Sequence, residues 1–406
     1  SGKVTEVDRE SIKEVDNLED QGAFKIFAVE GVEVGCDIEY FYTVKRMGGF
    51  FNRVFFQTKG EVKMAHFELI SPENLVFLAK GYNGFPDPKD TVIDEKRYLI
   101  ATKENIPLLD EERYAAYRSN LMRVEYKISH NELRSSAEMF TWSDAARMYY
   151  ELYFTPDSKA DKKIKKELKS MSLGGLNTDK KIKKIEKNLK REYGIEDIDN
   201  PALADINLIL DNKVANEAGM ISLFAAFFRN AGIEAQLMIT TDRFDLRFDG
   251  DFMSWAYLDY FVFYFPETKK YLAPTEFEFR YGLIPYGWTA NQALKIKTVG
   301  LGDVVSAVGK IDSIPGVKAE DHYDNLFINV EFAKDFRDPI LEVKRSFAGY
   351  NGMFIQPYYN YIPDEDREEV ITSLVQFISE DAEVEEWEVE NYDAVSYTHL
   401  RAHETS

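Results

Sequence analysis

The sequence has a single cysteine, Cys36, and only five histidines in 406 residues. One cysteine cannot form an internal disulfide, and zinc sites rich in cysteine are excluded. No run of about eighteen apolar residues occurs, so no membrane-spanning helix is expected. A net charge of −21 argues against nucleic acid as a partner, because phosphates would be repelled. No metal or cofactor is expected either.

Apolar residues make up 45% of the sequence and aromatic residues 14%, which excludes a disordered chain. The length favours two or three domains. We expect an α+β multidomain protein with an N-terminal β-sandwich at 1–134, an α+β core at 135–300 and a small C-terminal β domain at 320–393. Residues 394–406 lack an apolar period and resemble a translated sequencing adapter, so we predict a non-native tail there. An ordinary frayed terminus is the alternative.

The first third of the chain carries the strand signal. Within 34–44, aromatic and β-branched residues alternate with polar ones, which is typical of a half-buried strand. Neighbouring strands are expected at 52–58 and 61–70. Cys36 falls inside the first of these strands, and no basic residue nearby would lower the pKa of its thiol. We therefore interpret it as a packed hydrophobe rather than a nucleophile.

The middle of the chain changes to helical spacing. Helices are expected at 143–154, at 159–171 and from an N-cap at Thr178. Residues 159–191 contain thirteen basic and four acidic residues. Because these lysines surround an apolar stripe and no aromatic residue interleaves them, we interpret them as solvated faces rather than a nucleic-acid or membrane patch. The alternatives are that these lysines complement the acidic segment 363–393, or that they form one continuous patch that binds a partner.

The most informative segment begins at Asn216, which can cap a helix that Gly232 ends. Strands are expected at 234–240, 258–265 and 271–275. This order of a helix and then antiparallel strands resembles the papain-like core of bacterial transglutaminase-like proteins.

Two motifs carry the resemblance. Phe-Arg-Asn-Ala-Gly-Ile at 228–233 matches the family's Leu-Arg-x-x-Gly-Ile, and Leu-Ala-Pro-Thr at 272–275 matches its Leu-Asp-Pro-Thr. The segment around 32–40 is similar to the uncharacterised N-terminal domain often joined to this core in secreted bacterial proteins. Residues 325–392 resemble their small C-terminal β domain. The resemblance implies a papain/transglutaminase-like α+β core and a location in the periplasm or outside the cell.

The resemblance also implies a Cys-His-Asp triad, but all three positions hold other residues. The nucleophile position falls on Glu217, the histidine position on Tyr257 or Tyr260, and the aspartate position on Ala273. No histidine occurs anywhere in the predicted core. A thiolate enzyme needs an imidazole and an orienting carboxylate. We therefore expect a catalytically degenerate member of the family, with no catalytic residue, that is not an enzyme.

Carboxylates could replace the lost triad. The dipole of the helix that starts at Glu217 is expected to lower the pKa of that side chain, which disfavours a general acid. A hydrolase that pairs Glu217 with Asp251 or Asp259 is the alternative function. The aspartates between 242 and 251 lack the spacing of a calcium loop, and we interpret them as a solvated loop.

Trp255, Asp259, Tyr286 and Trp288 fall where they would wall the former active-site cleft. Aromatic side chains of this kind favour binding of an extended peptide or a glycan, and ordinary packing is the alternative. We expect a non-catalytic transglutaminase-like scaffold with a binding or structural role at the bacterial cell envelope. Its expected partner is a peptide, a glycan or another envelope protein.

Overall fold

In the computed structural model, the chain divides into two compact units, residues 1–49 and 50–406. The structure describes residues 49–375 except 199, 302–303, 333–339, 354, 356–357 and 360–361, together with 383–390, 398–405 and, before 49, residues 10, 12–15, 24–26, 28, 33–35, 38–39 and 41–45. Over these ranges the protein is mixed α/β with several sheets. None of the helices found there combines the length and apolarity needed to cross a bilayer. The predicted domain boundaries stay predictions.

Within its described residues, the first unit contains a short antiparallel pair, β1 (Lys13–Val15) with β2 (Phe24–Ile26). The prediction of a strand at 34–44 is wrong for the described residues of that segment, which are irregular and exposed. Alternation of side chains alone does not make a strand, because the backbone also needs a hydrogen-bonded neighbour. Cys36 lies outside the described residues.

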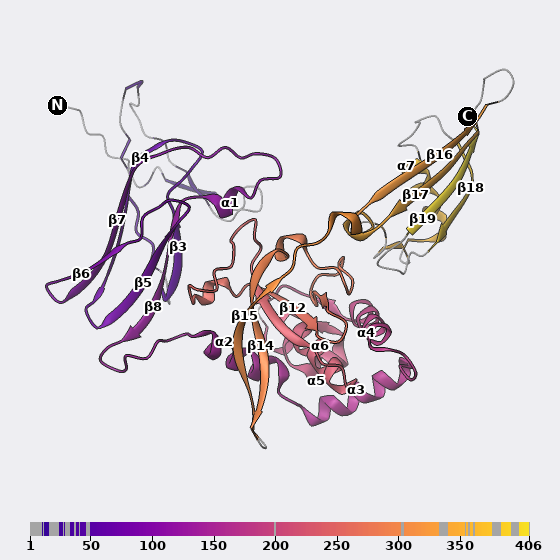
Figure 1. The fold of residues 1–406 in the computed structure, drawn as a ribbon, viewed down its shortest axis with the longest axis horizontal. Coiled ribbons are helices and arrows are strands. Elements are labelled where there is room, and N and C mark those ends of the chain that lie inside the picture. Colours follow the sequence, from indigo (N-terminus) through magenta and orange to yellow (C-terminus); the bar gives the residue numbers. More distant parts are fainter. Residues whose placement is uncertain are drawn as a thin grey trace. The chain divides into compact units, whose positions relative to one another are not determined.

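The second unit begins with two three-stranded antiparallel sheets (Figure 1). The first has the order β3 (Phe51–Phe55), β8 (Arg123–Asn131), β5 (Leu75–Tyr82). The second has the order β4 (Val62–Pro72), β7 (Lys96–Ile106), β6 (Lys89–Ile93). A short helix, α1 (Tyr117–Asn120), precedes β8. The strands predicted at 52–58 and 61–70 are confirmed as β3 and β4. We call this two-sheet part the β module.

Strand β8 has different chemistry on its two faces. Val124 and Tyr126 contribute to an apolar cluster shared by both sheets of the β module. Arg123, Glu125 and Lys127 alternate with them and are nevertheless buried, with exposed fractions of 2%, 1% and 2%. Charged side chains are seldom buried without partners, so this face must pack against polar groups from another part of the chain.

Residues 142–230 contain five α-helices in their described part: α2 (Trp142–Phe154), α3 (Ser158–Ser170), α4 (Thr178–Glu192), α5 (Ile206–Asn212) and α6 (Glu217–Asn230). Each follows a polar residue whose side chain accepts backbone N–H groups of the first turn. The cap of α4 is Asn177, one residue before the predicted Thr178, with its Oδ1 2.9 Å from the Lys180 nitrogen. Between these helices lie the 3₁₀ helix η2 (Pro201–Leu203) and two short parallel strands, β9 (Gly194–Ile195) and β10 (Val214–Ala215).

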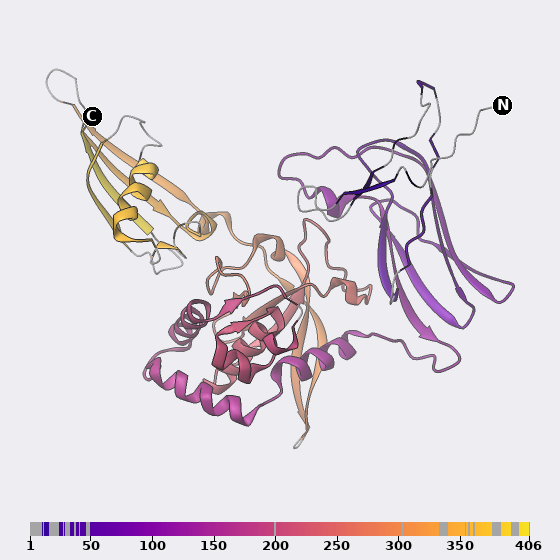
Figure 2. The same cartoon turned by 180° about the vertical axis from the view of Figure 1, so that it is seen from behind.

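The helices pack on a five-stranded antiparallel sheet, as Figures 1 and 2 show. Its order is β13 (Lys270–Leu272), β12 (Tyr260–Phe265), β11 (Gln236–Thr240), β14 (Asn291–Leu301), β15 (Val304–Ile314). Leu237 and Phe263 join the helical core on one face, whereas Met238 and Val262 face a smaller cluster on the other. Strand alternation thus gives the sheet two apolar faces, and α6 is buried against the first of them.

Helices α3 and α4 bury their apolar stripes and expose most of their lysines, whereas Lys190 of α4 is buried. Ile164, Ile182 and Ile185 have no exposed surface, whereas Lys166 and Lys184 are exposed. The apolar faces are therefore used in the core.

The chain ends with a four-stranded sheet of order β16 (Asp324–Glu331), β17 (Ile340–Phe347), β19 (Thr398–Thr405), β18 (Glu383–Glu390), accompanied by α7 (Asp364–Val375). The 3₁₀ helices η5 (Ala319–Asp321) and η6 (Gly349–Asn351) flank its first two strands. Strand β19 lies within the predicted tail 394–406 and pairs with both β17 and β18. Whether that segment is native stays a prediction.

Candidate functional site

The site starts at the N-terminal end of α6. Asn216 accepts a hydrogen bond from the Gly219 nitrogen at 2.9 Å, so that Glu217 becomes the first residue of the helix. A Cβ on Gly219 would lie 2.1 Å from the Leu203 carbonyl oxygen. Only glycine therefore allows the first turn of α6 to sit this close to η2, and this close contact fixes the position of Glu217.

Two further carboxyl groups lie in segments next to strands of the five-stranded sheet. Asp259 directly precedes β12, and its nitrogen donates to the Thr240 oxygen at 3.3 Å. Glu276 lies four residues after the end of β13 and follows the Leu-Ala-Pro-Thr motif. Burial raises the pKa of Glu217, and the charges of Glu276, Asp197 and Asp259 raise it further. Glu276 and Asp259 thus act on Glu217 although the three residues come from separate elements, and we call Glu217, Asp259 and Glu276 the acidic site.

Each member of the acidic site has a raised pKa. Burial is the main cause for Asp259, where the charge of Arg53 acts in the opposite direction. Burial is also the main cause for Glu276, where Lys190 opposes it. A carboxyl group that is partly desolvated and lies near like charges favours its neutral form. Burial thus favours the neutral form at all three positions, and a cation opposes it at two of them: Arg53 at Asp259 and Lys190 at Glu276.

The expected decrease of the Glu217 pKa is wrong. Its side chain lies in the first turn of α6, where the helix dipole favours a carboxylate. However, desolvation and the charges of Glu276, Asp197 and Asp259 outweigh that effect. A dipole contact at an accessible helix end is worth only about 0.3–1 kcal/mol, and the sequence did not show which acids the fold would bring near.

The two candidates for the histidine position lie in different surroundings. Tyr260 is next to Asp259, and its pKa is raised by burial and then by the charges of Asp259 and, more weakly, Glu276. Tyr257 is completely buried, and its hydroxyl lies 3.2 Å from that of Tyr82 in the β module. Tyr260 therefore shares the acidic site, whereas Tyr257 belongs to a separate network. Ala273, the aspartate position, is also buried, with 1% exposure.

The predicted aromatic residues mostly pack. Trp288 is 4% exposed and stacks on Tyr260 with ring centres 4.8 Å apart. Trp255 is partly buried against Phe140, with ring centres 5.1 Å apart. Tyr286 is 56% exposed and contacts Tyr350 edge-on at 5.9 Å. These contacts fit the packing alternative for both tryptophans, and Tyr286 is the most accessible of the three.

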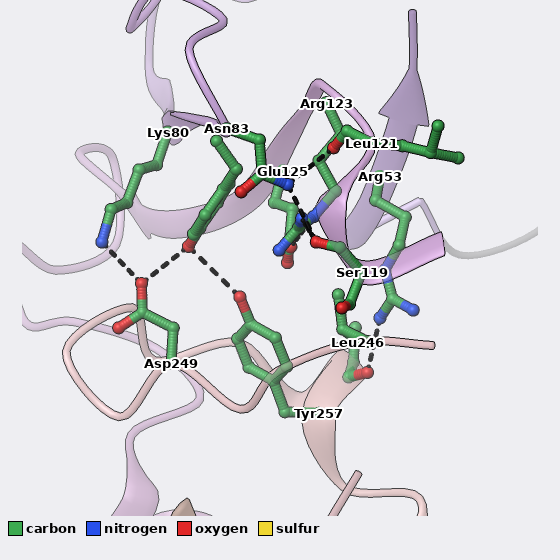
Figure 3. A network of polar contacts seen from close by, with 12 residues as sticks. Arg53, Lys80, Asn83, Ser119, Leu121, Arg123, Glu125, Leu246, Asp249 and Tyr257 are labelled. Atoms are coloured by element: carbon green, nitrogen blue, oxygen red, sulfur yellow. Dashed lines mark hydrogen bonds and ion pairs between the residues drawn. The ribbon is translucent and has the colours of Figure 1, made fainter. Parts of the chain in front are cut away.

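The loop between β11 and β12 contacts the β module (Figure 3). We call the contacts of Lys80, Tyr82, Asp249 and Tyr257 the joint. Asp249 of this loop accepts hydrogen bonds from Lys80 at 2.5 Å and from the Tyr82 hydroxyl at 2.8 Å. Burial raises the pKa of Tyr82 and of Tyr257 well above the ordinary value, so both hydroxyls are neutral donors. Asp249 is therefore an ion-pair partner. Burial is the largest single effect on its pKa and raises it, but Lys80, Tyr82 and a backbone hydrogen bond from Asp251 together lower the pKa below its ordinary value.

Charged residues of β8 form the other side of this joint. Arg123 and Glu125 make a buried ion pair at 2.7 Å, and Lys127 pairs with Glu138. Asp242 accepts a hydrogen bond from the Phe244 nitrogen at 2.8 Å, which stabilises the loop locally.

Among the residues that the structure describes, no group of three His, Cys, Asp or Glu side chains is arranged to hold a metal ion.

Sequence reasoning missed two residues around the acidic site. Glu276 lies three residues beyond Ala273, and its closeness to the family motif was an available signal. Arg53 lies on β3, more than 200 positions from Asp259, and nothing in its sequence context pointed to it.

Comparison with known proteins gives two results. Residues 1–107 match the family model of a domain of unknown function with a solved structure, DUF3857. The fold is similar to the crystal structure of a protein from Parabacteroides distasonis that is provisionally named a protease, with a TM-score of 0.49 and 12% identity over 100% of this chain and 81% of that one. No curated protein matches the chain.

Proposed function

We propose that the protein is a non-catalytic, transglutaminase-like scaffold whose acidic site binds a positively charged group of an extended peptide. The proposal is carried by the raised pKa values of Glu217, Asp259 and Glu276 and by the charges of Glu276 and Asp259 that act on Glu217 at the start of α6. In the resemblance drawn from the sequence, Glu217 takes the place of the nucleophile and Tyr257 or Tyr260 that of the histidine. We further propose a location at the bacterial cell envelope, in the periplasm or outside the cell.

A cationic ligand suits the site better than a neutral one. Partly desolvated carboxylates close to one another repel, and a bound ammonium or guanidinium group would compensate both effects. Binding should therefore favour the ionised carboxylates and release protons. Because both tryptophans pack against other rings, charge is a stronger basis for recognition than a wide aromatic surface.

The test uses a peptide with one lysine, blocked at both ends, and the matched peptide with glutamate. We expect NMR titration to show binding of the lysine peptide only, weaker at high salt and stronger as the pH rises through the raised carboxyl pKa values. Glu217→Gln combined with Glu276→Gln should abolish it. Glu151→Gln on α2, an exposed glutamate, is the matched control because it leaves the net charge of the acidic site unchanged. Equal binding by the double variant and the control would contradict the proposal.

A carboxylate hydrolase is the second candidate. It is favoured by the raised pKa of Glu217, since a general acid must hold its proton near working pH. Turnover of aryl glycosides that is lost in Glu217→Gln and retained in Glu151→Gln would support this candidate and overturn the non-catalytic proposal. Alkylation of Cys36 should leave peptide binding unchanged in either case.

A further inference from the structure

Tyr350 of η6 connects the four-stranded sheet at the end of the chain, which we call the C-terminal sheet, to the core. His322, which directly follows η5, contacts that tyrosine. We propose that the contact between His322 and Tyr350 is a pH-sensitive latch, closed while the imidazole is neutral and opened when the ring takes up a proton. No ligand of the acidic site is involved.

Tyr350 reaches the core with both its hydroxyl and its ring. The hydroxyl donates to the Ile284 oxygen at 2.8 Å. The ring lies edge-on to those of Phe279 and Tyr286, with centres 6.3 and 5.9 Å away. Among the described residues, the apolar cluster of the C-terminal sheet around Phe347 shares no member with the clusters of the core. The attachment therefore depends on individual side chains rather than on a common apolar core.

A second tyrosine makes a separate attachment. The Tyr358 hydroxyl donates to Oε1 of Glu278 at 2.7 Å, and its ring lies 5.8 Å from that of Phe277. No histidine takes part in either contact. Tyr358 is therefore an internal reference for a change that is confined to Tyr350.

The ring of His322 both bonds to Tyr350 and stacks on it. Nδ1 accepts a hydrogen bond from the Tyr350 backbone nitrogen at 3.0 Å, and the two rings stack with centres 4.4 Å apart and planes 10° apart. Gly349 has a φ of +58°, and a Cβ at this position would lie 2.0 Å from His322 Nδ1. Only glycine leaves room for the imidazole against this backbone, so the sequence of η6 fits the contact.

The direction of this hydrogen bond determines the protonation state of the imidazole. A backbone N–H group can only donate, so Nδ1 of His322 must be the unprotonated nitrogen, and the neutral ring carries its proton on Nε2. A protonated histidine is a donor at both nitrogens. Uptake of a proton would therefore place the new N–H of Nδ1 against the N–H of Tyr350, and the hydrogen bond would be lost.

Other charges near the latch come from several elements. Asp321 of η5 favours the cationic form of His322, but burial has the larger effect and lowers the pKa of the imidazole below its ordinary 6.5. Arg243, in the loop between β11 and β12, and Tyr286 of η4 act on Tyr350. Burial raises the pKa of Tyr350 to about 12, so its hydroxyl remains a donor while His322 titrates. His322 is therefore the partner of this contact that changes its charge.

The latch should open as the pH falls. The closed latch has an imidazole with a lowered pKa, whereas a released imidazole has the ordinary value of 6.5. The open form therefore binds the proton more tightly, so closure is strongest above 6.5 and weakens as the pH falls through the lowered pKa. For each unit between the two pKa values, the ratio of open to closed latch should rise about tenfold once both forms are protonated.

The experiment follows the latch in the full chain by NMR. The ring nitrogen shifts of His322 report its tautomer and its pKa. Hydrogen exchange of the Tyr350 amide, normalised at each pH to the exchange of an unstructured chain, reports the hydrogen bond. Proton–proton contacts between the rings of Tyr350 and Tyr286 report docking on the core, and those between Phe277 and Tyr358 are the reference.

Three variants isolate the contribution of His322. His322→Asn keeps an acceptor but does not titrate, whereas His322→Phe keeps a ring but has no acceptor. His66→Asn is the matched control, because His66 is exposed on β4 and its Nδ1 contacts the Thr102 hydroxyl.

We expect the proton of neutral His322 on Nε2 at pH 7. Between pH 7 and pH 5, the Tyr350 amide should lose protection by the factor that the measured pKa of His322 predicts. The ring contacts of Tyr350 should weaken over the same range, while those of Tyr358 persist. His322→Asn should keep the amide protected throughout, and His322→Phe should already lack that protection at pH 7. His66→Asn should behave as the unmutated protein does.

Several results would overturn the latch. A proton on Nδ1 at pH 7 contradicts the hydrogen bond itself, and this measurement needs no variant. Protection of the Tyr350 amide that is unchanged at pH 5, or that falls equally in His322→Asn, removes His322 as the cause. Loss of the hydrogen bond with intact ring contacts of Tyr350 would show a local rearrangement that leaves the C-terminal sheet attached. None of these results depends on whether the acidic site binds a peptide.

Discussion

Lys190 and Glu186 form an ion pair inside the protein, with Nζ and Oε1 3.0 Å apart and exposed fractions of 2% and 3%. Lys190 also donates to the carbonyl oxygens of Glu276 and Phe279, and Glu186 accepts the Tyr281 nitrogen at 2.9 Å. The two side chains therefore connect α4 to the segment that follows β13 and carries Glu276. A buried charge is tolerated here because each partner has further hydrogen bonds.

Breaking this pair should be costly. Lys190→Met leaves Glu186 buried without its cation, and we expect the free energy of unfolding to fall by about 3–5 kcal/mol. Desolvation lowers the pKa of Lys190, and the charge of Glu186 opposes that effect. Chemical denaturation monitored by circular dichroism measures the loss.

The control for Lys190 is an exposed lysine of the same helix. Lys184→Met should change stability by no more than about 0.5 kcal/mol. If both substitutions had equally small effects, the buried pair would not hold the Glu276 segment.

Glu217→Gln should raise stability at neutral pH. The folded protein has a Glu217 pKa above the ordinary 4.5. The folded state therefore binds the proton more tightly than the unfolded state, and stability is lost as the pH rises from 4.5 through the folded pKa. Removing the charge should restore up to about 0.5 kcal/mol at pH 7 and nothing at pH 3, where both states are protonated.

Thermal unfolding at both pH values measures this effect, with Glu151→Gln as the matched variant. A loss of stability at pH 7 in Glu217→Gln alone would mean that the helix dipole outweighs desolvation at this position.

Tyr82 and Tyr257 should be coupled energetically across the joint. Tyr82→Phe removes the donor to Asp249 and should cost about 1–3 kcal/mol, because the buried hydroxyl of Tyr257 also loses a partner. Tyr257→Phe removes the other hydroxyl of the 3.2 Å pair. The double variant should cost less than the sum of the single ones, by at least about 0.5 kcal/mol.

The double-mutant cycle is measured by denaturant unfolding of the full chain. Strict additivity of the two substitutions would show that the β module and the loop are not joined through these hydroxyls.

Restoring the triad tests the match to the thiol enzymes. Glu217→Cys, Tyr260→His and Ala273→Asp together should give a cysteine that reacts with acyl substrates, detected as a covalent adduct by mass spectrometry. Glu217→Cys alone should not react, because no imidazole is present to take its proton. Replacing Tyr260→His by Tyr257→His is the control, since Tyr257 lies in the joint with Tyr82. Equal reaction of both triple variants would contradict the assignment of Tyr260.

Elements with a strong local signal could be predicted from the amino-acid sequence alone. The capping residue and apolar spacing of α6 place Glu217 in its first turn, and the strands 234–240 and 258–265 contain β11 and β12. The absence of the triad residues is also a fact of sequence. By contrast, residues 34–44 show that a regular alternation can fail when the tertiary structure does not supply a neighbouring strand to the described residues.

The electrostatics of the site depends on contacts between segments that are distant in the sequence. The pKa of Glu217 depends on Glu276 and Asp259, which are 59 and 42 positions away, whereas sequence reasoning considered only the local helix dipole. Likewise, Arg53 donates a hydrogen bond to the Ala256 oxygen across 203 positions. Charge interactions fall with distance in space and with solvent exposure, and neither quantity is set by the order of residues along the chain.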